Sequence, residues 1–223
     1  MNAPTEGTLL EQSISTGIEE VVRRRRAIHS FVPGPNITQE QWHKLFELTA
    51  LTPSSYNFQP WDFIVVEDQK QRADLQPLCW NQQQVMDSVA VVAVLGDKNP
   101  HRRDEQILQQ FVDDGYFNDE VKQTLKGSID VVYPDEARRI EHAVCGASLA
   151  AMTFMLVADG MGLGTAPLIG FDPKGVAEYL KVPDDYLVVM LLCVGHPSHK
   201  ELPRQPRRGY EDFVHWTKFG GKA

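Results

Sequence analysis

Cysteine is scarce in this chain. The three cysteines, Cys79, Cys145 and Cys193, lie far apart in a sequence of 223 residues and form no CxxC pair. Their spacing excludes a disulfide scaffold and a cysteine-based metal site. Cys145 and Cys193 lie in apolar runs, so we expect both in the core. An odd, unpatterned count also fits a reducing cytoplasm.

Long hydrophobic runs and an excess of basic charge are absent too. The longest uncharged stretch considered, residues 143–158, is short for a membrane span, and the first residues lack the pattern of a secretory signal. The net charge is −8, with 22 Lys and Arg against 30 Asp and Glu. This balance argues against nucleic acid or an anionic membrane as the main partner. We therefore expect a soluble, cytoplasmic protein.

Three apolar segments predict β-strands, at residues 61–67, 89–95 and 187–194. The second, VAVVAVL, is apolar on both faces, so we expect it at the centre of a sheet covered on both sides. No repeat or Gly/Ser linker divides the chain, which favours one domain over residues 1–223, with extensions at 1–15 and 200–223. Strands separated by helices predict a three-layer α/β or α+β fold.

Capping residues mark the expected helices. Thr16 and Thr38 begin two of them, a long helix runs from about Asp135 to Asp159, and another begins at Asp172. Residues 97–133 are polar and weakly periodic, which predicts one or two exposed helices with a mobile connection, and a lid would lie here. The apolar positions of the first two helices are Ile18, Val21 and Val22, and Trp42, Leu45, Phe46 and Leu48.

A stripe of small residues follows one side of the long helix at spacings of three and four. Such a stripe lets another backbone approach closely. It fits internal packing on the sheet, or a helix that crosses a partner subunit, and the sequence favours neither strongly. The stripe comprises Ala143, Gly146, Ala147, Ala150 and Ala151.

Arginine is concentrated near the two chain ends. Residues 23–26 are all arginine, and Arg204, Arg207 and Arg208 follow near the C-terminus. On an acidic protein, clustered guanidinium groups indicate a specific anion site, and their bidentate donors suit a phosphate. The alternative is a solvated charge run that favours the C-terminal dipole of the first helix.

The segment after the first arginines could form one side of that site. In an extended chain Arg25, Ala27 and His29 point to one side, while Ile28 points towards the core. That side would offer cationic and hydrogen-bonding groups around a small residue.

The loop PSSYNFQPW concentrates polar side chains between prolines. Ser54, Ser55, Asn57 and Gln59 supply hydroxyls and carboxamides, which can donate to and accept from the edge of a planar heterocycle. The alternative is a loop stabilised by its own side-chain to backbone bonds.

The segment GMGLGTAPLIG has glycines at a spacing other than GxGxxG, and it follows a helix instead of a strand. This context excludes a Rossmann dinucleotide site. Backbone amides at Ile169 and Gly170 could still approach a ring closely. The alternative is a helix cap and a connection to the next strand.

Taken in order, RRRAIHSF, PSSYNFQPW, Asn81, GLGTAPLIGFD and a C-terminal arginine pair resemble the FMN-dependent nitroreductase family, over about residues 18–216. The resemblance implies an α+β, three-layer fold with a central, mostly antiparallel sheet flanked by helices. It also implies an intertwined homodimer with FMN at the interface, and NADH or NADPH as electron donor.

The same resemblance implies the residues of the cofactor site, several of them from the partner subunit. Four residues depart from the commoner family pattern, namely Ala27, His29, Gln84 and Ile169, and the preference between NADH and NADPH stays open. The implied cofactor-binding residues are Arg25, Arg26, Ala27, His29, Ser54, Ser55, Asn57, Asn81, Gln84, Pro167, Leu168, Ile169, Gly170, Arg207 and Arg208.

The implied function is transfer of hydride from NAD(P)H through flavin N5 to a nitroaromatic or quinone acceptor by a ping-pong cycle. No catalytic side chain or metal is expected, and His142, His196 and His199 are interpreted as ordinary surface or packing residues. Two alternatives remain open. One is a specialised, dehalogenase-like or flavin-cleaving enzyme, and the other is a non-catalytic flavin-binding module.

Overall fold

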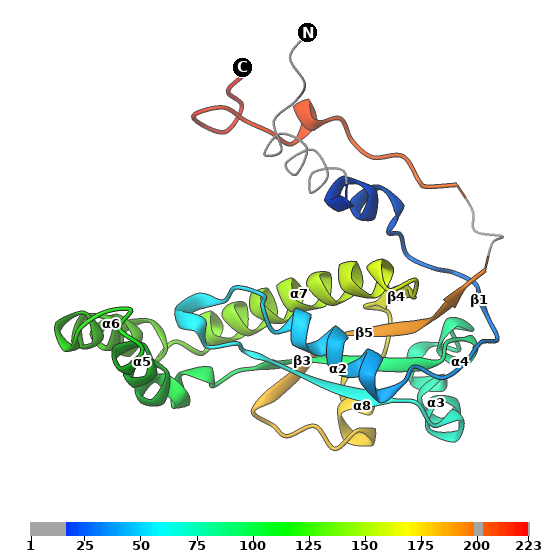
Figure 1. Cartoon of the computed structure of the whole chain (residues 1–223), viewed down its shortest axis with the longest axis horizontal. Coiled ribbons are helices and arrows are strands. Elements are labelled where there is room, and N and C mark those ends of the chain that lie inside the picture. Colours follow the sequence, from blue (N-terminus) through cyan, green and yellow to red (C-terminus); the bar gives the residue numbers. More distant parts are fainter. Residues whose placement is uncertain (1–16, 199–202, 223) are drawn as a thin grey trace, which may run out of the picture.

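A computed structural model describes residues 17–198 and 203–222 and arranges them as a β-sheet between layers of helices (Figure 1). The strand order is β1-β5-β3-β2, with β4 also paired to β5, and all neighbouring strands run antiparallel. The α+β fold with a mostly antiparallel sheet is thereby confirmed. The strands are β1 Phe31–Val32, β2 Trp61–Val66, β3 Ala90–Asp97, β4 Gly164–Leu168 and β5 Tyr186–Pro197.

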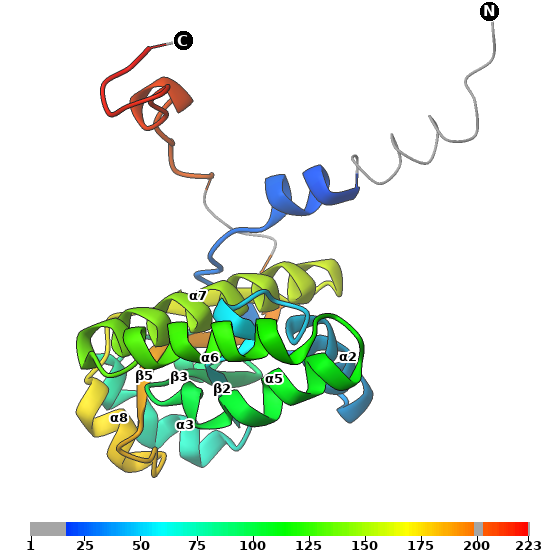
Figure 2. The ribbon, with the colours of Figure 1, turned by 90° about the vertical axis from the view of Figure 1, so that its left-hand side faces the viewer.

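Helices cover both faces of the sheet and form a hairpin at one end of it (Figures 1 and 2). Residues 17–24 form a further helix near the N-terminus. The labelled helices are α2 Gln39–Thr49, α3 Gln69–Leu75, α4 Gln84–Asp87, α5 Asp104–Asp113, α6 Asp119–Val132, α7 Glu136–Gly160 and α8 Pro173–Tyr179. Short 3-10 turns occur at η1 Ser55–Asn57, η2 Pro77–Cys79, η3 Pro100–Arg103 and η4 Tyr210–Asp212.

The central strand β3 carries the two main cores on its two faces. Val91 and Ala93 belong to a core shared with α3, α4 and α8, whereas Val92 and Val94 belong to one shared with α2 and α7. Because side chains alternate along a strand, one fully apolar strand supplies both layers. The predicted central position of this segment is confirmed, as β3 pairs with β2 on one side and β5 on the other.

The predicted helix starts agree with the structure where it describes them. Thr38 forms a complete capping box with Gln41, and Asp135 and Asp172 accept backbone hydrogen bonds at the starts of α7 and α8. Within α2 the buried residues include Trp42 and Leu45, while Leu48 is exposed. The cap at Thr16, the extension at residues 1–15 and His199 lie outside the described residues.

Strand β4 was not among the three strands that the sequence predicted. Residues 164–168 pair with β5 from Gly164–Gly195 to Leu168–Leu191. The glycine and the proline in this strand made it hard to predict, because both residue types are depleted in strand interiors. Pro167 is tolerated since β4 lies on the side of β5 opposite β3, at a sheet edge where a missing N–H costs little.

The small-residue stripe of α7 packs internally. Ala143, Gly146 and Ala147 are buried, and a Cβ on Gly146 would lie 2.5 Å from Cγ of Pro60. Packing on the sheet therefore accounts for this face. By length and composition α7 is the one described helix that could span a membrane, but its small-residue side belongs to the core.

The opposite side of α7 is exposed and largely apolar. Four of its side chains, Ile140, Val144, Leu149 and Met152, are 37 to 45% exposed. Cys145 is exposed as well, so the prediction that it lies in the core is wrong, whereas Cys193 is buried as predicted. Apolar residues occur on all sides of this helix, but only one side of it packs on the sheet. Apolar character therefore did not identify the buried side.

Residues 97–133 form two helices, as predicted, and these helices lie at one end of the molecule (Figure 1). This α5–α6 hairpin has a small core of its own, separate from the two cores of the sheet. Its buried members are Leu108, Ile129 and Tyr133, together with Phe58 from the loop before β2. The role of this segment as a lid remains a prediction.

Candidate functional site

The segment after the first helix is fixed beside β4. The backbone N–H of Ile28 donates to the carbonyl oxygen of Thr165 at 2.9 Å, and Ala27 forms an isolated parallel bridge with the same residue. Ile28 is 6% exposed and packs in the core, as the extended conformation predicted. The arginines before it are thus held at the edge of the sheet.

The C-terminal segment returns to this edge. Nη2 of Arg204 donates to the carbonyl oxygens of Arg23 at 2.6 Å and Arg25 at 2.7 Å. Two arginine clusters about 180 residues apart therefore meet, as the sequence predicted. Between them lies a cavity of about 300 Å³, whose lining residues are Arg26, Ala27, His29, Pro203, Arg204, Gln205 and Arg207.

The electrostatics of this corner favour an anion. Burial lowers the pKa of Arg25, the positive charges of Arg204 and Arg207 lower it further, and only Asp159 among the named neighbours raises it. Asp159 is itself paired with Arg24 at 2.9 Å. Nη1 of Arg25 is buried and has no hydrogen-bond partner among the described residues. A buried donor among excess positive charge is relieved by a multivalent acceptor such as phosphate.

The three C-terminal arginines differ in their contacts. Arg204 and Arg207 line the cavity, and Arg207 also donates to the carbonyl oxygen of Gln205 at 2.9 Å. Arg208 is not among the lining residues, and its guanidinium lies 5.6 Å from the centre of the Phe213 ring. The sequence left open which of the three meets an anion, and the geometry favours Arg204 and Arg207.

From this corner β4 leads to the predicted ring-binding segment. Ile169 is four residues beyond Thr165, so it lies about 13 Å further along the strand direction. Its side chain is 77% exposed, and Gln82 fixes the next residue through a 2.7 Å hydrogen bond from Nε2 to the carbonyl oxygen of Gly170. A Cβ on Gly170 would lie 2.8 Å from the ring of Trp80, so a larger residue here would displace that ring.

The tight turn at residues 80–81 lies against Gly170. Together with the exposed Ile169 it forms an exposed patch at the end of β4. Trp80 and Asn81 have left-handed φ angles of 52° and 57°, and both side chains are exposed. Gln84, at the start of α4, is half-buried. The family resemblance implied Asn81 and Gln84, and their role at a cofactor remains a prediction. Trp80 and Gln82, which contact Gly170, were not among the implied residues, and a bulky aromatic beside Asn81 was the available signal.

The polar loop at residues 54–59 is not part of this patch in a single chain. Ser54 and Ser55 line a cavity of about 70 Å³ with Cys145 and Leu149, in the first half of α7. The arginine corner instead meets Asp159 at the end of that helix. Fourteen helical residues separate Cys145 from Asp159, which is about 21 Å. In a single chain the loop and the corner therefore do not meet.

The loop also makes bonds of its own. The backbone N–H of Gln59 donates to Oγ of Ser54 at 2.8 Å, which agrees with the self-bonded alternative for that serine. Ser55 and Asn57 have exposed side chains. Within residues 17–198 and 203–222, no group of three or more His, Cys, Asp or Glu could hold a metal ion.

Two histidines that the sequence analysis interpreted as surface or packing residues have structural contacts. Nδ1 of His142 lies 3.1 Å from the hydroxyl of Tyr133, and Nε2 of His196 lies 2.9 Å from the carbonyl oxygen of Pro35.

The candidate site thus has two parts. One is the arginine corner, whose charge suits an anion, and the other is the exposed patch at the end of β4, which could hold a planar group.

The chain is similar to known proteins over most of its length. The model of a family described as the Nitroreductase family matches residues 22–196. The chain is 32% identical over 188 residues to the "Putative NAD(P)H nitroreductase YodC" of Bacillus subtilis, a match that covers 83% of this chain and 93% of that protein.

Two solved structures are also similar. The "putative nitroreductase ydfN" of Bacillus subtilis has a TM-score of 0.86 and 32% identity, over 91% of this chain and 99% of its own. A "putative nitroreductase in complex with FMN" from Exiguobacterium sibiricum has a TM-score of 0.80 and 32% identity, over 89% of this chain and 96% of its own.

Proposed function

The chain belongs to the nitroreductase family, and we propose that it is an FMN-dependent oxidoreductase that carries hydride from NADH or NADPH to a small-molecule acceptor. The acceptor class we propose is a nitroaromatic compound or a quinone, reduced in a ping-pong cycle. The relatives named as NAD(P)H nitroreductases and the similar structure solved with FMN support this assignment.

One observation carries the proposal, namely the meeting of the two arginine clusters around a cavity. Arg204 and Arg207 line it, and the buried Nη1 of Arg25 lacks a partner among the described residues. These donors fit the phosphate of FMN. Ala27 beside them is small enough to let the phosphate and the ribityl chain approach the backbone.

The exposed patch at the end of β4 would hold the ring. When bound, FMN supplies the redox chemistry, since its N5 can take up hydride and release it to an acceptor. The backbone amides of Ile169 and Gly170 would donate to the ring, and the amide of Asn81 would orient its polar edge. Trp80 and Ile169 would cover part of it with apolar surface.

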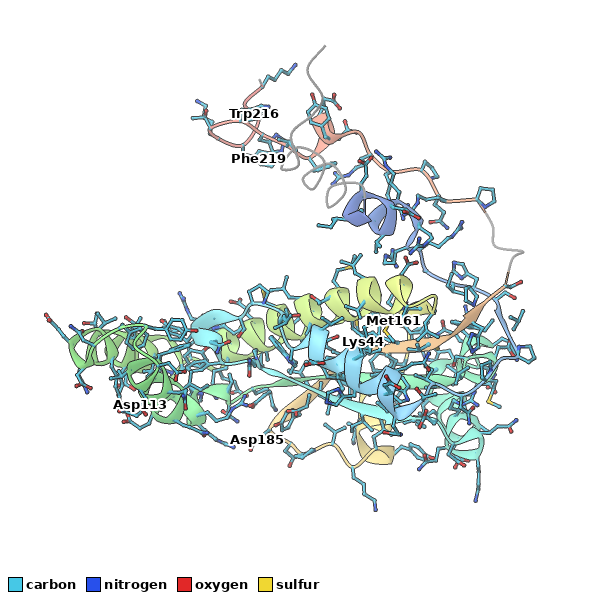
Figure 3. All side chains as sticks on the ribbon, viewed as in Figure 1. Lys44, Asp113, Met161, Asp185, Trp216 and Phe219 are labelled. Atoms are coloured by element: carbon cyan, nitrogen blue, oxygen red, sulfur yellow. The ribbon has the colours of Figure 1, made fainter. Side chains whose placement is uncertain are left out.

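We further propose that the active form is a homodimer. The apolar outer side of α7 is exposed, as are Ile18 and Val22 of the N-terminal helix. The C-terminal segment carries four exposed aromatic side chains, of which Figure 3 labels Trp216 and Phe219 well away from the sheet. These surfaces need a covering partner. A partner would also bring Ser54, Ser55 and Asn57 to the cofactor.

The test uses the purified protein with its released cofactor identified. We expect FMN, bleaching of its visible absorbance by NADH or NADPH without oxygen, and recovery of the absorbance on addition of a quinone. A flavin that stays oxidised with both nicotinamides would contradict the reductase and favour a non-catalytic binding module.

A further inference from the structure

The loop before β2 has an unusual backbone. Tyr56, Asn57 and Gln59 have φ angles of 52°, 54° and 47°, all in the left-handed region. Residues other than glycine avoid this region because Cβ crowds the following carbonyl oxygen, although asparagine tolerates it better. Three such residues within four positions persist only if the surrounding structure holds them.

Local hydrogen bonds hold part of the loop. Ser54 accepts from Asn57 through its carbonyl oxygen at 3.1 Å and from Gln59 through its hydroxyl at 2.8 Å. Phe58 donates to the carbonyl oxygen of Ser55 at 3.0 Å. These bonds close the turn, and the N–H of Trp61 donates to the carbonyl oxygen of Gln59 at 2.8 Å. They leave the carbonyl oxygen of Phe58 to a partner outside the loop.

Arg103 supplies that partner from the start of the α5–α6 hairpin. Its Nη2 donates to the carbonyl oxygen of Phe58 at 2.8 Å and lies 3.4 Å from that of Gln59. An ion pair with Asp97, at 3.6 Å, orients the guanidinium. The residue directly before α5 is thereby bonded to the strained part of the loop.

Tyr133 holds the loop from the other end of the hairpin, directly after α6. Its ring contacts the rings of Tyr56 and Phe58, with centroids 6.4 and 5.4 Å apart. Its hydroxyl meets Nδ1 of His142 at 3.1 Å and hydrogen bonds to Ser55. Phe58 itself is 1% exposed and fills the hairpin core with Leu108. Loop and hairpin thus share one small core.

We propose that the α5–α6 hairpin fixes the backbone of residues 54–59, and that Arg103 and Tyr133 are positioning residues for the side of this loop that carries Ser55 and Asn57. That the loop faces the cofactor of a partner subunit rests on the proposed function. The support of the loop by the hairpin rests on the contacts above. A displaced hairpin would therefore move the polar groups that contact the flavin, although the hairpin itself need not touch it.

The first test measures hydrogen exchange of the backbone N–H groups of residues 54–60, where Pro60 carries none, in the purified full-length protein. Arg103→Met keeps most of the side-chain stem but removes the donors. We expect these amides to exchange about tenfold faster, because a charge-assisted hydrogen bond is lost. The matched control is Arg102→Met, since Arg102 is the sequence neighbour and pairs with Asp185 at 2.6 Å instead. It should leave exchange in the loop unchanged.

A second variant covers the case in which Arg103→Met does not fold. Tyr133→Phe keeps the aromatic packing and removes only the hydroxyl bonds to His142 and Ser55. We expect faster exchange at residues 54–60, a severalfold higher KM for the quinone, and a thermal midpoint within a few degrees of the parent. Tyr116→Phe, at an exposed tyrosine of the same hairpin, should change none of these.

The two proposals can fail separately. If Arg103→Met and Tyr133→Phe leave the exchange of residues 54–60 at the parent rate, the positioning role is wrong, whatever the enzyme reduces. If the parent protein neither binds FMN nor oxidises NAD(P)H while both variants loosen the loop, the proposed function is wrong and the structural support stands.

Discussion

Arg25 and Arg23 are two residues apart, yet their side chains have different surroundings. Arg23 is exposed and pairs with Glu19 at 2.6 Å on its own helix. Arg25 lies beside Arg204 and Arg207, with a buried nitrogen that has no partner among the described residues. Concentrated positive charge destabilises this corner unless an anion binds there. The sequence run of four arginines conceals this difference.

We expect Arg25→Gln to weaken FMN binding by about tenfold to a hundredfold, because one charge-assisted contact is worth about 1.5–3 kcal/mol. Arg23→Gln should change the affinity less than threefold. Titration of the apoprotein with FMN, followed by flavin fluorescence, measures both. Equal affinities in the two variants would show that the phosphate site lies elsewhere.

The buried cysteines predict how stability depends on pH. Burial raises the pKa of Cys193 from 9.0 to about 12 and that of Cys79 to about 11. A thiol with a raised pKa in the folded state stabilises the fold below the unfolded pKa, and this contribution is lost as pH rises towards the folded value. Stability should therefore fall above about pH 9.

Between pH 8 and pH 10.5, the free energy of unfolding should fall by about 2 kcal/mol less in Cys193→Ala than in the parent protein. The substitution also leaves a cavity, but the cavity lowers the free energy of unfolding equally at both pH values and so does not affect the difference between them. Cys145→Ala is the control, since Cys145 is exposed whereas Cys193 is buried. Urea unfolding at the two pH values measures the difference, and an identical alkaline loss in Cys193→Ala and the parent would refute it.

At the scale of elements, patterns of capping and apolar periodicity predicted α2, α7, α8 and the three longer strands. β4 was missed because Gly164 and Pro167 lack strand propensity, and its pairing with β5 depends on tertiary context. The exposure of Cys145 was missed because the helix is apolar around its full circumference. The left-handed loop residues could not be predicted either, since their conformation is stabilised by Arg103 and Tyr133, more than 40 residues away.

The packing of α7 on the sheet gives a prediction for two helical glycines. Gly146→Ala should destabilise the fold by about 1–3 kcal/mol, because the added methyl group would overlap the rigid ring of Pro60. Gly127→Ala in α6 has no heavy atom within 4 Å of the new Cβ, so it should stabilise by about 0.5–1 kcal/mol. Urea unfolding of the two variants tests this contrast, and two changes of the same sign would contradict it.

At the scale of the whole molecule, the proposed site is not complete in one chain. The arginine corner meets Asp159 at the end of α7, whereas the polar loop lies beside Cys145 and Leu149 of the same helix. Both terminal segments extend away from the sheet on the same side (Figure 1). The resemblance in the sequence implied this arrangement through a partner subunit. The distance along α7 gives an independent physical reason for it.

We expect a homodimer in solution, with a mass of about twice 25.2 kDa by light scattering. Met152→Lys places a charge on the exposed apolar side of α7, so it should yield a monomer that has released its FMN. Val131→Lys, on the exposed surface of α6, should remain a dimer with FMN bound. A monomeric parent protein that retains FMN would contradict the shared site.

The central claim is that guanidinium groups from both ends of the chain bind the phosphate of one flavin. The most direct measurement compares the affinities of the apoprotein for FMN and for riboflavin, which differ only in the phosphate. We predict that FMN binds at least about a hundredfold more tightly, equivalent to about 2.7 kcal/mol, and that Arg25→Gln reduces this ratio about tenfold. Equal affinity for the two flavins would contradict the account.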